Sequence, residues 1–237
     1  MICIAAAMEA EIEETIRRIA PSNVDRWGVS RIHIGDLGGV KVCCARTGVG
    51  KVFASATTAH LITRYRPEAL IFIGTAGALD PTLEIGDLVI ATDSVQHDLD
   101  ATQFGFARGE VPYDGFRFFA SSSFLVEAAR KYRSDETRVR LGRIVSGDQF
   151  CDLSLRRERP YLEGELGGVA IEMEGAAAAA AATLGKTPFL LARIVSDRAD
   201  GGAKRDFSKF ILNASSKLAS FVEYIVSVIP AKPTESH

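Results

Sequence analysis

The chain has 237 residues, 47% hydrophobic and 24% charged, which is an ordinary composition for a globular protein with a sizeable core. The net charge of −2 and the pI near 6.1 argue against a nucleic-acid partner, which usually meets a basic face. No apolar run approaches the roughly 18 residues needed to cross a bilayer, and the acidic start lacks the basic segment of a signal peptide, so we expect a cytoplasmic protein without a membrane partner.

The cysteines and histidines show no spacing typical of a metal site or a disulfide framework. Cys3, Cys43, Cys44 and Cys151 form no C-x-x-C pair, and the histidines lack the intervals of zinc ligands. We therefore expect reduced, partly buried thiols and no metal ligands.

Short apolar runs rich in β-forming residues alternate with helical patterns along the chain. This alternation predicts an α/β fold with a central mixed, largely parallel twisted sheet flanked by helices. We expect one domain over residues 1–230 and a flexible tail over 231–237. The expected strands lie in 2–7, 31–45 (two strands and a turn), 68–73, 86–95, 141–146, 168–172 and 187–197; the expected helices lie in 10–20, 50–65, 121–133, 176–184 and 206–229; and 99–118 form a long connection.

Small and acidic residues follow each of several predicted strands, where open α/β sheets bind their ligands. Each acidic residue taken alone could simply favour the first turn of the next helix. Taken together they predict one shared pocket, because Glu172 and Asp197 emerge directly from apolar runs. The strand-end residues are Met8, Glu9 and Glu11; Gly74, Thr75, Ala76 and Gly77; Ser146, Gly147 and Asp148; Glu172, Met173 and Glu174; and Ser196 and Asp197.

Two phosphate-binding motifs are excluded by their own spacing. In "TGVGKVF" no Ser or Thr follows Lys51, and Ala45 stands where the phosphate loop needs its first glycine. The segment "GTAGAL" does not fit G-x-G-x-x-G, although its glycines would let the backbone approach a ligand closely.

The stretch from Ala170 to Gly185 joins two glutamates to an alanine run. If the chain stays extended there, Glu172 and Glu174 share one face and Met173 points to the other. The alanines at 176–182 predict a core helix that lies close to the sheet, and its N-terminus would favour the ionised form of Glu174.

Eight motifs in order resemble the nucleoside phosphorylase/nucleosidase superfamily, and specifically the 5'-methylthioadenosine/S-adenosylhomocysteine nucleosidases. They are "AAAMEAEIE", "TGVGKV", "IFIGTAGAL", "EIGDLVIA", "QHDLDATQFG", "IVSGDQF", "IEMEGAA" and "RIVSDRAD". The resemblance covers nearly the whole chain and implies a nucleoside phosphorylase-like fold. It also implies hydrolysis of the N-glycosidic bond of both nucleosides, releasing adenine and the 5-thio-ribose sugar.

The resemblance implies a role for each matching residue. Glu11 corresponds to the base that activates the attacking water, Asp197 to the acid that protonates the purine at N7, and Glu174 to the ligand of the ribose hydroxyls. The other implied substrate-binding residues are Phe150, which stacks on the adenine; Cys151, whose backbone reads the adenine edge; Met173, Glu172 and Arg193 around the ribose; Thr75, Ala76 and Gly77 in the glycine-bearing segment; Ser196, which supports Asp197; and Val49, Phe207 and, from a neighbouring subunit, Phe104 and Pro112 around the alkylthio group.

The chemistry of N-glycosidic cleavage fits these residue types. A purine leaves well only when it is protonated, and an aspartate in a poorly solvated strand end can carry that proton. A second carboxylate then helps water attack the cationic sugar from the opposite face, as in an inverting glycosidase. This reaction requires no metal and no redox cofactor.

Three alternatives remain open on the sequence. A purine nucleoside phosphorylase would need cations for phosphate, whereas "MEAEIEE" is acidic and Arg46 has no assigned place. A nucleoside-binding protein without turnover would have no need of both an acid and a base. Departures at Thr75, Ala101 and 108–118 leave open the choice among methylthioadenosine, S-adenosylhomocysteine, 5'-deoxyadenosine and futalosine-type substrates.

The segment 99–113 is apolar enough to need a partner. The resemblance places it at a neighbouring subunit, so we expect a homodimer in which this loop completes the neighbour's pocket.

Overall fold

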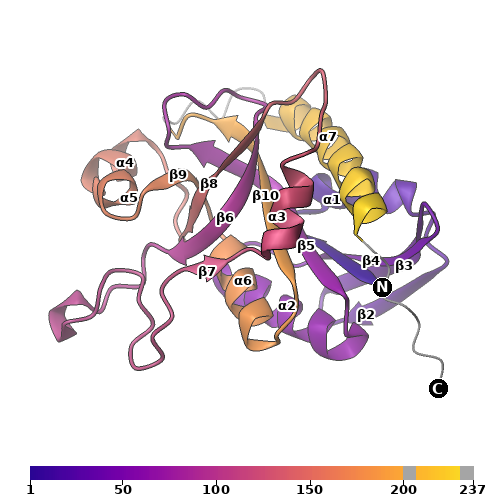
Figure 1. The fold of residues 1–237 in the computed structure, drawn as a ribbon, viewed down its shortest axis with the longest axis horizontal. Coiled ribbons are helices and arrows are strands. Elements are labelled where there is room, and N and C mark those ends of the chain that lie inside the picture. Colours follow the sequence, from indigo (N-terminus) through magenta and orange to yellow (C-terminus); the bar gives the residue numbers. More distant parts are fainter. Residues whose placement is uncertain (200–206, 230–237) are drawn as a thin grey trace.

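A ten-stranded mixed sheet runs through the middle of the molecule, with helices on both faces (Figure 1). The computed structural model describes residues 1–199 and 207–229, the latter with side chains from Phe210 onward, so the expected tail at 231–237 lies outside the described residues. The strands are β1 (Ile2–Ala6), β2 (Asn23–Trp27), β3 (Ser30–Leu37), β4 (Val40–Arg46), β5 (Ala69–Ala78), β6 (Leu88–Gln96), β7 (Phe119–Ala120), β8 (Val139–Ser146), β9 (Gly168–Glu172) and β10 (Phe189–Asp197). The helices are α1 (Glu9–Arg18), α2 (Lys51–Tyr65), the short 3₁₀ helix η1 (Thr102–Phe104), α3 (Ser123–Ala129), α4 (Leu153–Glu158), α5 (Tyr161–Gly164), α6 (Gly175–Leu184) and α7 (Phe207–Val228).

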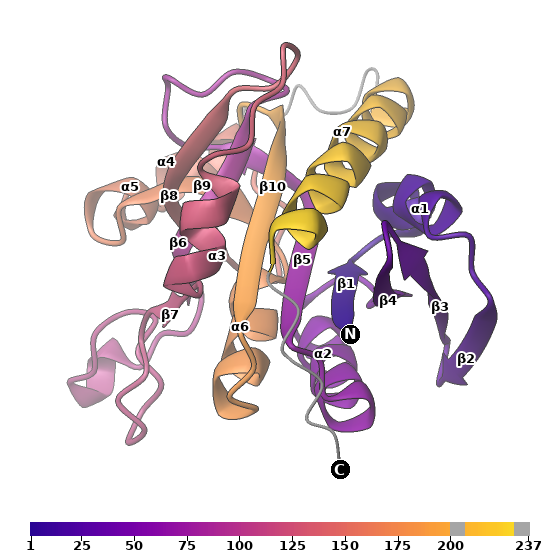
Figure 2. The same ribbon diagram turned by 45° about the vertical axis from the view of Figure 1, so that its right-hand side comes forward.

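The strand order is β10-β6-β8-β9-β5-β1-β4-β3-β2, and β5 also pairs with β10. The strands β5, β9, β8, β6 and β10 therefore form a closed ring, from which β1, β4, β3 and β2 extend to one side (Figure 2). Parallel pairs join β1 to β4 and β5, β10 to β5, and β8 to β6 and β9. Antiparallel pairs are as frequent among the described strands, so the sheet is mixed as expected but less dominated by parallel pairs.

Two helical layers cover the sheet, and the side chains of β5 pack against both of them. Ile71 and Ile73 pack in the core that α1, α3 and α7 cover, whereas Leu70 and Phe72 pack in the core beneath α2 and α6. Successive side chains of a strand point to opposite faces, so a strand buried on both sides is apolar throughout. The parallel carboxyl ends of β1, β5 and β10 consequently meet at one edge, which these two layers hold rigidly.

The alanine run forms the buried helix α6, which confirms the prediction of a core helix close to the sheet. Ala176, Ala178 and Ala182 are fully buried. A Cβ on Gly175, the first residue of α6, would lie 2.5 Å from Leu191 Cδ2 on β10. The helix therefore begins in direct contact with the strand, and its small side chains keep it there.

Three parts of the sheet differ from the sequence prediction, and one of them is the two-residue strand β7, which lies outside the expected strands. The strand expected to end at Ile73 continues to Ala78, because β10 pairs with it as far as Gly77 and β9 pairs with its last two residues. The strand β2 was not predicted, since it is a largely exposed edge strand with polar side chains that pairs only with β3. Residues 99–118 contain η1 and form the expected long connection, which projects from the lower left of Figure 1.

The four cysteines are buried and free of disulfides, as expected. Within residues 1–199 and 207–229, no helix has the length and apolar character needed to span a membrane.

Candidate active site

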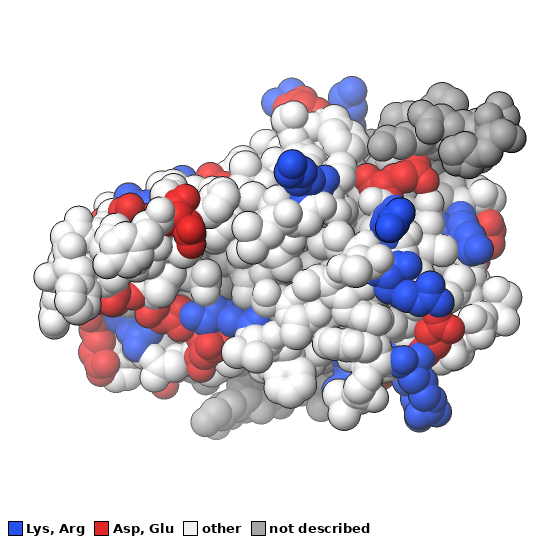
Figure 3. All heavy atoms as spheres, turned by 90° about the horizontal axis from the view of Figure 1, so that it is seen from below, with Lys and Arg blue, Asp and Glu red and all other residues white. Residues whose placement is uncertain are grey.

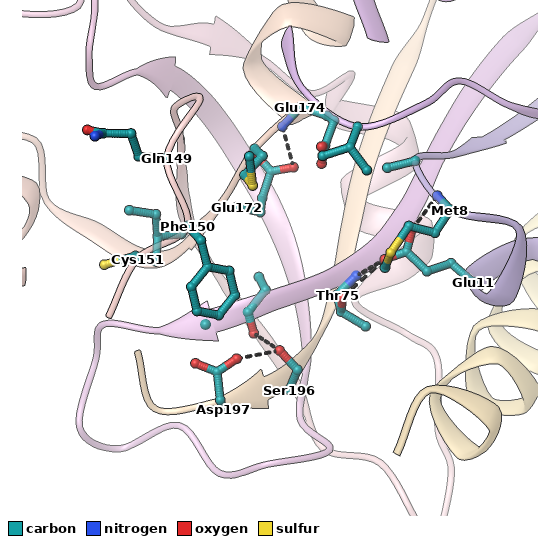
Figure 4. Close-up of a pocket in the computed structure, with 16 residues that line it drawn as sticks. Met8, Glu11, Thr75, Gln149, Phe150, Cys151, Glu172, Glu174, Ser196 and Asp197 are labelled. Carbon is teal, nitrogen blue, oxygen red and sulfur yellow. Dashed lines mark hydrogen bonds between the residues drawn. The ribbon is translucent and has the colours of Figure 1, made fainter. Parts of the chain in front are cut away.

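A pocket with a cavity volume of about 180 Å³ lies where the carboxyl ends of β1, β5, β9 and β10 meet the start of α2 and the loop after β8 (Figure 4). Most of the predicted site residues line it. Sequence reasoning missed three lining residues, Ala7, Gln149 and Ile171, although each lies within a quoted motif. The lining residues are Ala7, Met8, Glu11, Val49, Thr75, Ala76, Gly77, Gln149, Phe150, Cys151, Ile171, Glu172, Met173, Glu174, Ser196 and Asp197.

Glu11 is held in the first turn of α1 by contacts to two strand ends. Its Oε2 accepts a hydrogen bond from the backbone N–H of Met8 at 3.0 Å. Its Oε1 accepts from the backbone N–H and the hydroxyl of Thr75 at 2.9 and 3.0 Å. Burial raises the pKa of Glu11 above its ordinary value, although the positive charge of Arg193 and these hydrogen bonds oppose the rise.

The close approach of Glu11 depends on a glycine. A Cβ on Gly74 would lie 2.9 Å from Glu11 Oε1 and 3.2 Å from the guanidinium of Arg193. Any larger residue at this point of β5 would push the carboxylate and the guanidinium away from the strand.

Glu172 and Arg193 form a buried ion pair beneath the pocket. Arg193 Nη2 lies 2.7 Å from Glu172 Oε2, and Nε lies 3.2 Å from the same oxygen. The Glu172 carboxylate also accepts the backbone N–H groups of Glu174 and Gly175 and pairs with the Ser146 hydroxyl. Glu172 therefore fixes the turn from β9 into α6, and Arg193, expected among the ribose ligands, lies behind the pocket wall instead.

Glu174 is the N-cap residue of α6 and its Oε1 accepts the backbone N–H of Gly50 at 2.8 Å. The expectation of a shared strand face with Glu172 was wrong, because β9 ends at Glu172 and Glu174 adopts φ −137° and ψ −37°. The helix end does not decide the pKa of Glu174. Burial and the negative charge of Glu172 raise the pKa of Glu174 to about 8, outweighing Arg193 and the Gly50 N–H.

Asp197 ends β10 at an irregular register between Val195 and Asp197. The Ser196 hydroxyl lies 2.7 Å from Asp197 Oδ2, and the backbone N–H of Ala199 donates to Oδ1 at 2.8 Å. A Cβ on Gly77 would lie 3.1 Å from Oδ1, so the glycine of β5 leaves room for this carboxyl. Asp197 is buried and faces the pocket from the side opposite to Glu11 (Figure 4).

The loop after β8 supplies the remaining wall. The Phe150 ring lines the pocket and is 58% exposed, so one of its faces is free to contact a bound molecule. Burial raises the pKa of Cys151 to about 11, and its thiol is therefore neutral at physiological pH. The expected role of the Cys151 backbone at the adenine edge stays a prediction.

Besides Arg193, two of the substrate-binding residues that the resemblance implies, Phe104 and Pro112, do not line the pocket of this chain. Phe104 and Pro112 lie in the projecting 99–118 segment, and their place in a neighbouring subunit's pocket stays a prediction. Phe207 begins α7, but its side chain lies outside the described residues. Arg46, which had no assigned place, pairs with Glu9 at 3.9 Å and is absent from the lining.

The sequence of this chain matches a known family. The phosphorylase superfamily model matches residues 1–227. A 5'-methylthioadenosine/S-adenosylhomocysteine nucleosidase of Staphylococcus haemolyticus is 33% identical over 232 residues, which are 97% of this chain and 100% of the relative.

Solved structures agree with the sequence relatives. The 5'-methylthioadenosine/S-adenosylhomocysteine nucleosidase of Neisseria meningitidis, in complex with methylthio-immucillin-A, has a TM-score of 0.87 and 36% identity, covering 96% of this chain and 99% of that one. The futalosine hydrolase of Helicobacter pylori has a TM-score of 0.89 and 29% identity, covering 96% and 97%. The chain therefore belongs to the phosphorylase superfamily and, within it, to the family of 5'-methylthioadenosine/S-adenosylhomocysteine nucleosidases.

Proposed function

We propose that this protein hydrolyses the N-glycosidic bond of 5'-methylthioadenosine and S-adenosylhomocysteine, releasing adenine and the 5-thio-ribose sugar. The observation that carries the proposal is a pair of buried carboxyl groups, Glu11 and Asp197, that face one pocket from opposite sides. Such a pair supplies an acid for the leaving purine and a base for water. The names of the related enzymes support these two substrates.

Asp197 is the proposed general acid. It delivers its proton to N7 of the adenine while the bond between N9 and C1' breaks and the bonding electrons move to the purine. Ser196 and the Ala199 N–H fix the orientation of the carboxyl group. Phe150 stacks on the adenine, and the backbone of Cys151 reads its edge.

Glu11 is the proposed general base. A water oxygen bonds to C1' of the cationic sugar and passes its proton to Glu11, which Met8 and Thr75 hold in place. Glu174 binds the ribose hydroxyls and Met173 packs on the sugar. The negative charge on Glu11 also stabilises the oxocarbenium ion before water attacks.

The pocket wall favours water over phosphate as the nucleophile. None of the described residues that line it is Lys or Arg, and Arg193 behind it is already paired with Glu172. A phosphate ion would meet the carboxylates of Glu11 and Glu172 without a cation to balance its charge. Futalosine-type nucleosides are the second candidate substrate, because the futalosine hydrolase of Helicobacter pylori has the same fold.

Incubation of the purified protein with methylthioadenosine, S-adenosylhomocysteine, adenosine, inosine and futalosine, each with and without phosphate, tests the proposal. We expect adenine from the first two nucleosides at the same rate in either buffer, measured by chromatography. Base release that requires phosphate would establish a phosphorylase, and tight nucleoside binding without any base release would establish a binding protein.

Substitution of the two proposed catalytic carboxyls should abolish turnover while the fold remains intact. Asp197→Asn cannot deliver a proton and Glu11→Gln cannot accept one, so we expect kcat to fall by about 10²–10⁴-fold in each variant. Thermal unfolding and calorimetric titration with methylthioadenosine provide the controls for folding and binding. Adenine release at the wild-type rate by either variant would contradict its assigned role.

The raised pKa of Glu174 makes stability depend on pH. Its pKa is about 8 in the folded protein against an ordinary value of 4.5, so the folded state holds this proton more tightly than the unfolded state. The resulting contribution to the free energy of unfolding is fully present below the ordinary pKa and is lost as the pH rises through about 8.

Urea denaturation at about pH 6 and about pH 9 measures this loss. We expect Glu174→Gln to show a smaller fall in the free energy of unfolding between the two conditions than the wild type, because an amide does not ionise. An equal fall in both proteins would show that Glu174 does not titrate in this range.

We also propose a homodimer in which each 99–113 loop completes the neighbour's pocket. Phe104 and Tyr113 on this loop are 81% and 93% exposed, and Val52 and Phe53 on α2, beside the pocket residue Val49, are 77% and 54% exposed. The face that carries α2 and α6 shows few charged side chains across its centre (Figure 3). Large exposed apolar side chains grouped in this way are typical of an interaction surface.

Light scattering should show a dimer, and mixing two variants tests whether the subunits share sites. An Asp197→Asn chain lacks the acid but keeps an intact 99–113 loop. A Phe104→Ala chain keeps the acid but has an altered loop. Subunit exchange would therefore create one complete site in each mixed dimer, and activity should exceed that of the separate variants. A fully active monomer, or a mixture without any gain, would contradict the shared site.

A further inference from the structure

Three residues outside the pocket lining form a closed ring of charged contacts, here called the Lys51–Asp98–Asp148 ring. Lys51 Nζ lies 2.6 Å from Asp98 Oδ1, and Asp98 Oδ2 accepts the backbone N–H of Asp148 at 2.9 Å. Asp148 Oδ1 in turn accepts the backbone N–H of Lys51 at 2.8 Å, and its Oδ2 lies 3.8 Å from Lys51 Nζ. The ring thus joins three segments: the start of α2, the residues after β6 and the loop after β8.

We propose that Lys51, Asp98 and Asp148 are positioning residues that hold two walls of the pocket at the separation the nucleoside requires. The inference rests on the proposed function and deepens it, since it assigns substrate affinity to residues that touch no substrate.

The ring residues Lys51 and Asp148 lie one or two positions along the chain from residues that form the sugar wall and the adenine wall of the pocket. Lys51 follows Val49 and Gly50, and the Gly50 N–H donates to Glu174, the proposed ribose ligand. Asp148 precedes Gln149 and Phe150, which form the adenine wall. A shift of the ring therefore moves the sugar wall and the adenine wall relative to each other, and displacements of this kind weaken binding and orientation.

Helix α2 depends on the ring for its N-terminal cap. Its N-cap residue is Gly50, which has no side chain, and its first turn contains no acidic residue. Asp148 supplies the missing acceptor from another segment, which satisfies one of the free N–H groups at the helix start. Lys51 places a positive charge at the N-terminus of α2, where the helix dipole disfavours a cation, and the carboxylates of Asp98 and Asp148 balance that charge.

The charge of Lys51 is what keeps the two aspartates together. Burial disfavours the ionised form of Asp98, but the Lys51 ammonium and the Asp148 N–H outweigh it and hold the pKa of Asp98 below its ordinary value. Without Lys51, two carboxylates would face each other across the ring and repel. The loop after β8 would then move away from α2.

The adjacent His97 shows how closely the two loops pack. His97 is fully buried, and a Cβ on Gly147 would lie 2.2 Å from its Nε2. The backbone N–H of His97 donates to Ser146 O at 2.9 Å. The loop after β8 therefore contacts the end of β6 directly, and the Lys51–Asp98–Asp148 ring joins both segments to α2.

Steady-state kinetics of four variants with methylthioadenosine test the proposal. Lys51→Met should raise KM by about 10-fold and leave kcat within about threefold, because Glu11 and Asp197 lie on α1 and β10, away from the ring. Lys51→Arg keeps the cation and should restore most of the affinity. Lys51→Met combined with Asp98→Asn should be no worse than Lys51→Met alone, since both changes break the same ring.

Arg138→Met is the matched control. Arg138 pairs with the buried Asp87 through two contacts of 3.0 and 2.7 Å, at the opposite end of β6 from Asp98. This variant removes a comparable ion pair and should change the melting temperature without changing KM.

An unchanged KM in Lys51→Met, in a protein that hydrolyses methylthioadenosine, would overturn the ring proposal and leave the proposed function standing. An equal rise of KM in Arg138→Met would also overturn it, by showing a general effect of stability. If the wild type hydrolyses no nucleoside, the proposed function fails. The ring proposal is then decided by calorimetric titration with adenine, which must bind Lys51→Met more weakly than the wild type.

Discussion

The buried ion pair between Glu172 and Arg193 is the contact on which the geometry of the whole site depends. It joins β9 to β10, and the same carboxylate holds the first N–H groups of α6 and the Ser146 hydroxyl of β8. Removing two charges from water costs several kcal/mol per ion, and such a pair persists only when its remaining polar atoms are satisfied. Arg193 meets this condition through the carbonyl oxygens of Phe72 and Ala192.

The proposed chemistry follows from this constraint. The oxygens of Glu172 are occupied by these protein groups, and its negative charge helps to keep a proton on Glu174. Arg193 acts in the opposite sense on Glu11, since its positive charge limits the effect of burial on that pKa. Burial raises the pKa of both carboxyls, Arg193 limits the rise at both, and the charge of Glu172 adds to the rise at Glu174.

The sequence was sufficient for the α/β class, the alanine helix and most pocket residues, because strand-end residues and ordered motifs need no long-range information. It could not give the partners of buried charges. Arg193 was assigned to the ribose and lies behind the wall, since only the folded chain shows that Glu172 lies beside it. Glu174 does not have the extended backbone considered from the sequence, because the chain turns into α6 directly after Glu172. The sequence shows Lys51 only beside a glycine in a segment similar to a phosphate loop. Its role in the ring could not be predicted, because its partners lie 47 and 97 positions away in the chain.

The central claim is that water, placed by Glu11, attacks C1' of the sugar. Hydrolysis of methylthioadenosine in water enriched in oxygen-18, with phosphate present, tests it most directly by mass spectrometry of the sugar product. The account predicts free methylthioribose that carries the oxygen-18 label at C1. A sugar 1-phosphate without the label would contradict the account, because phosphate rather than water would then be the nucleophile.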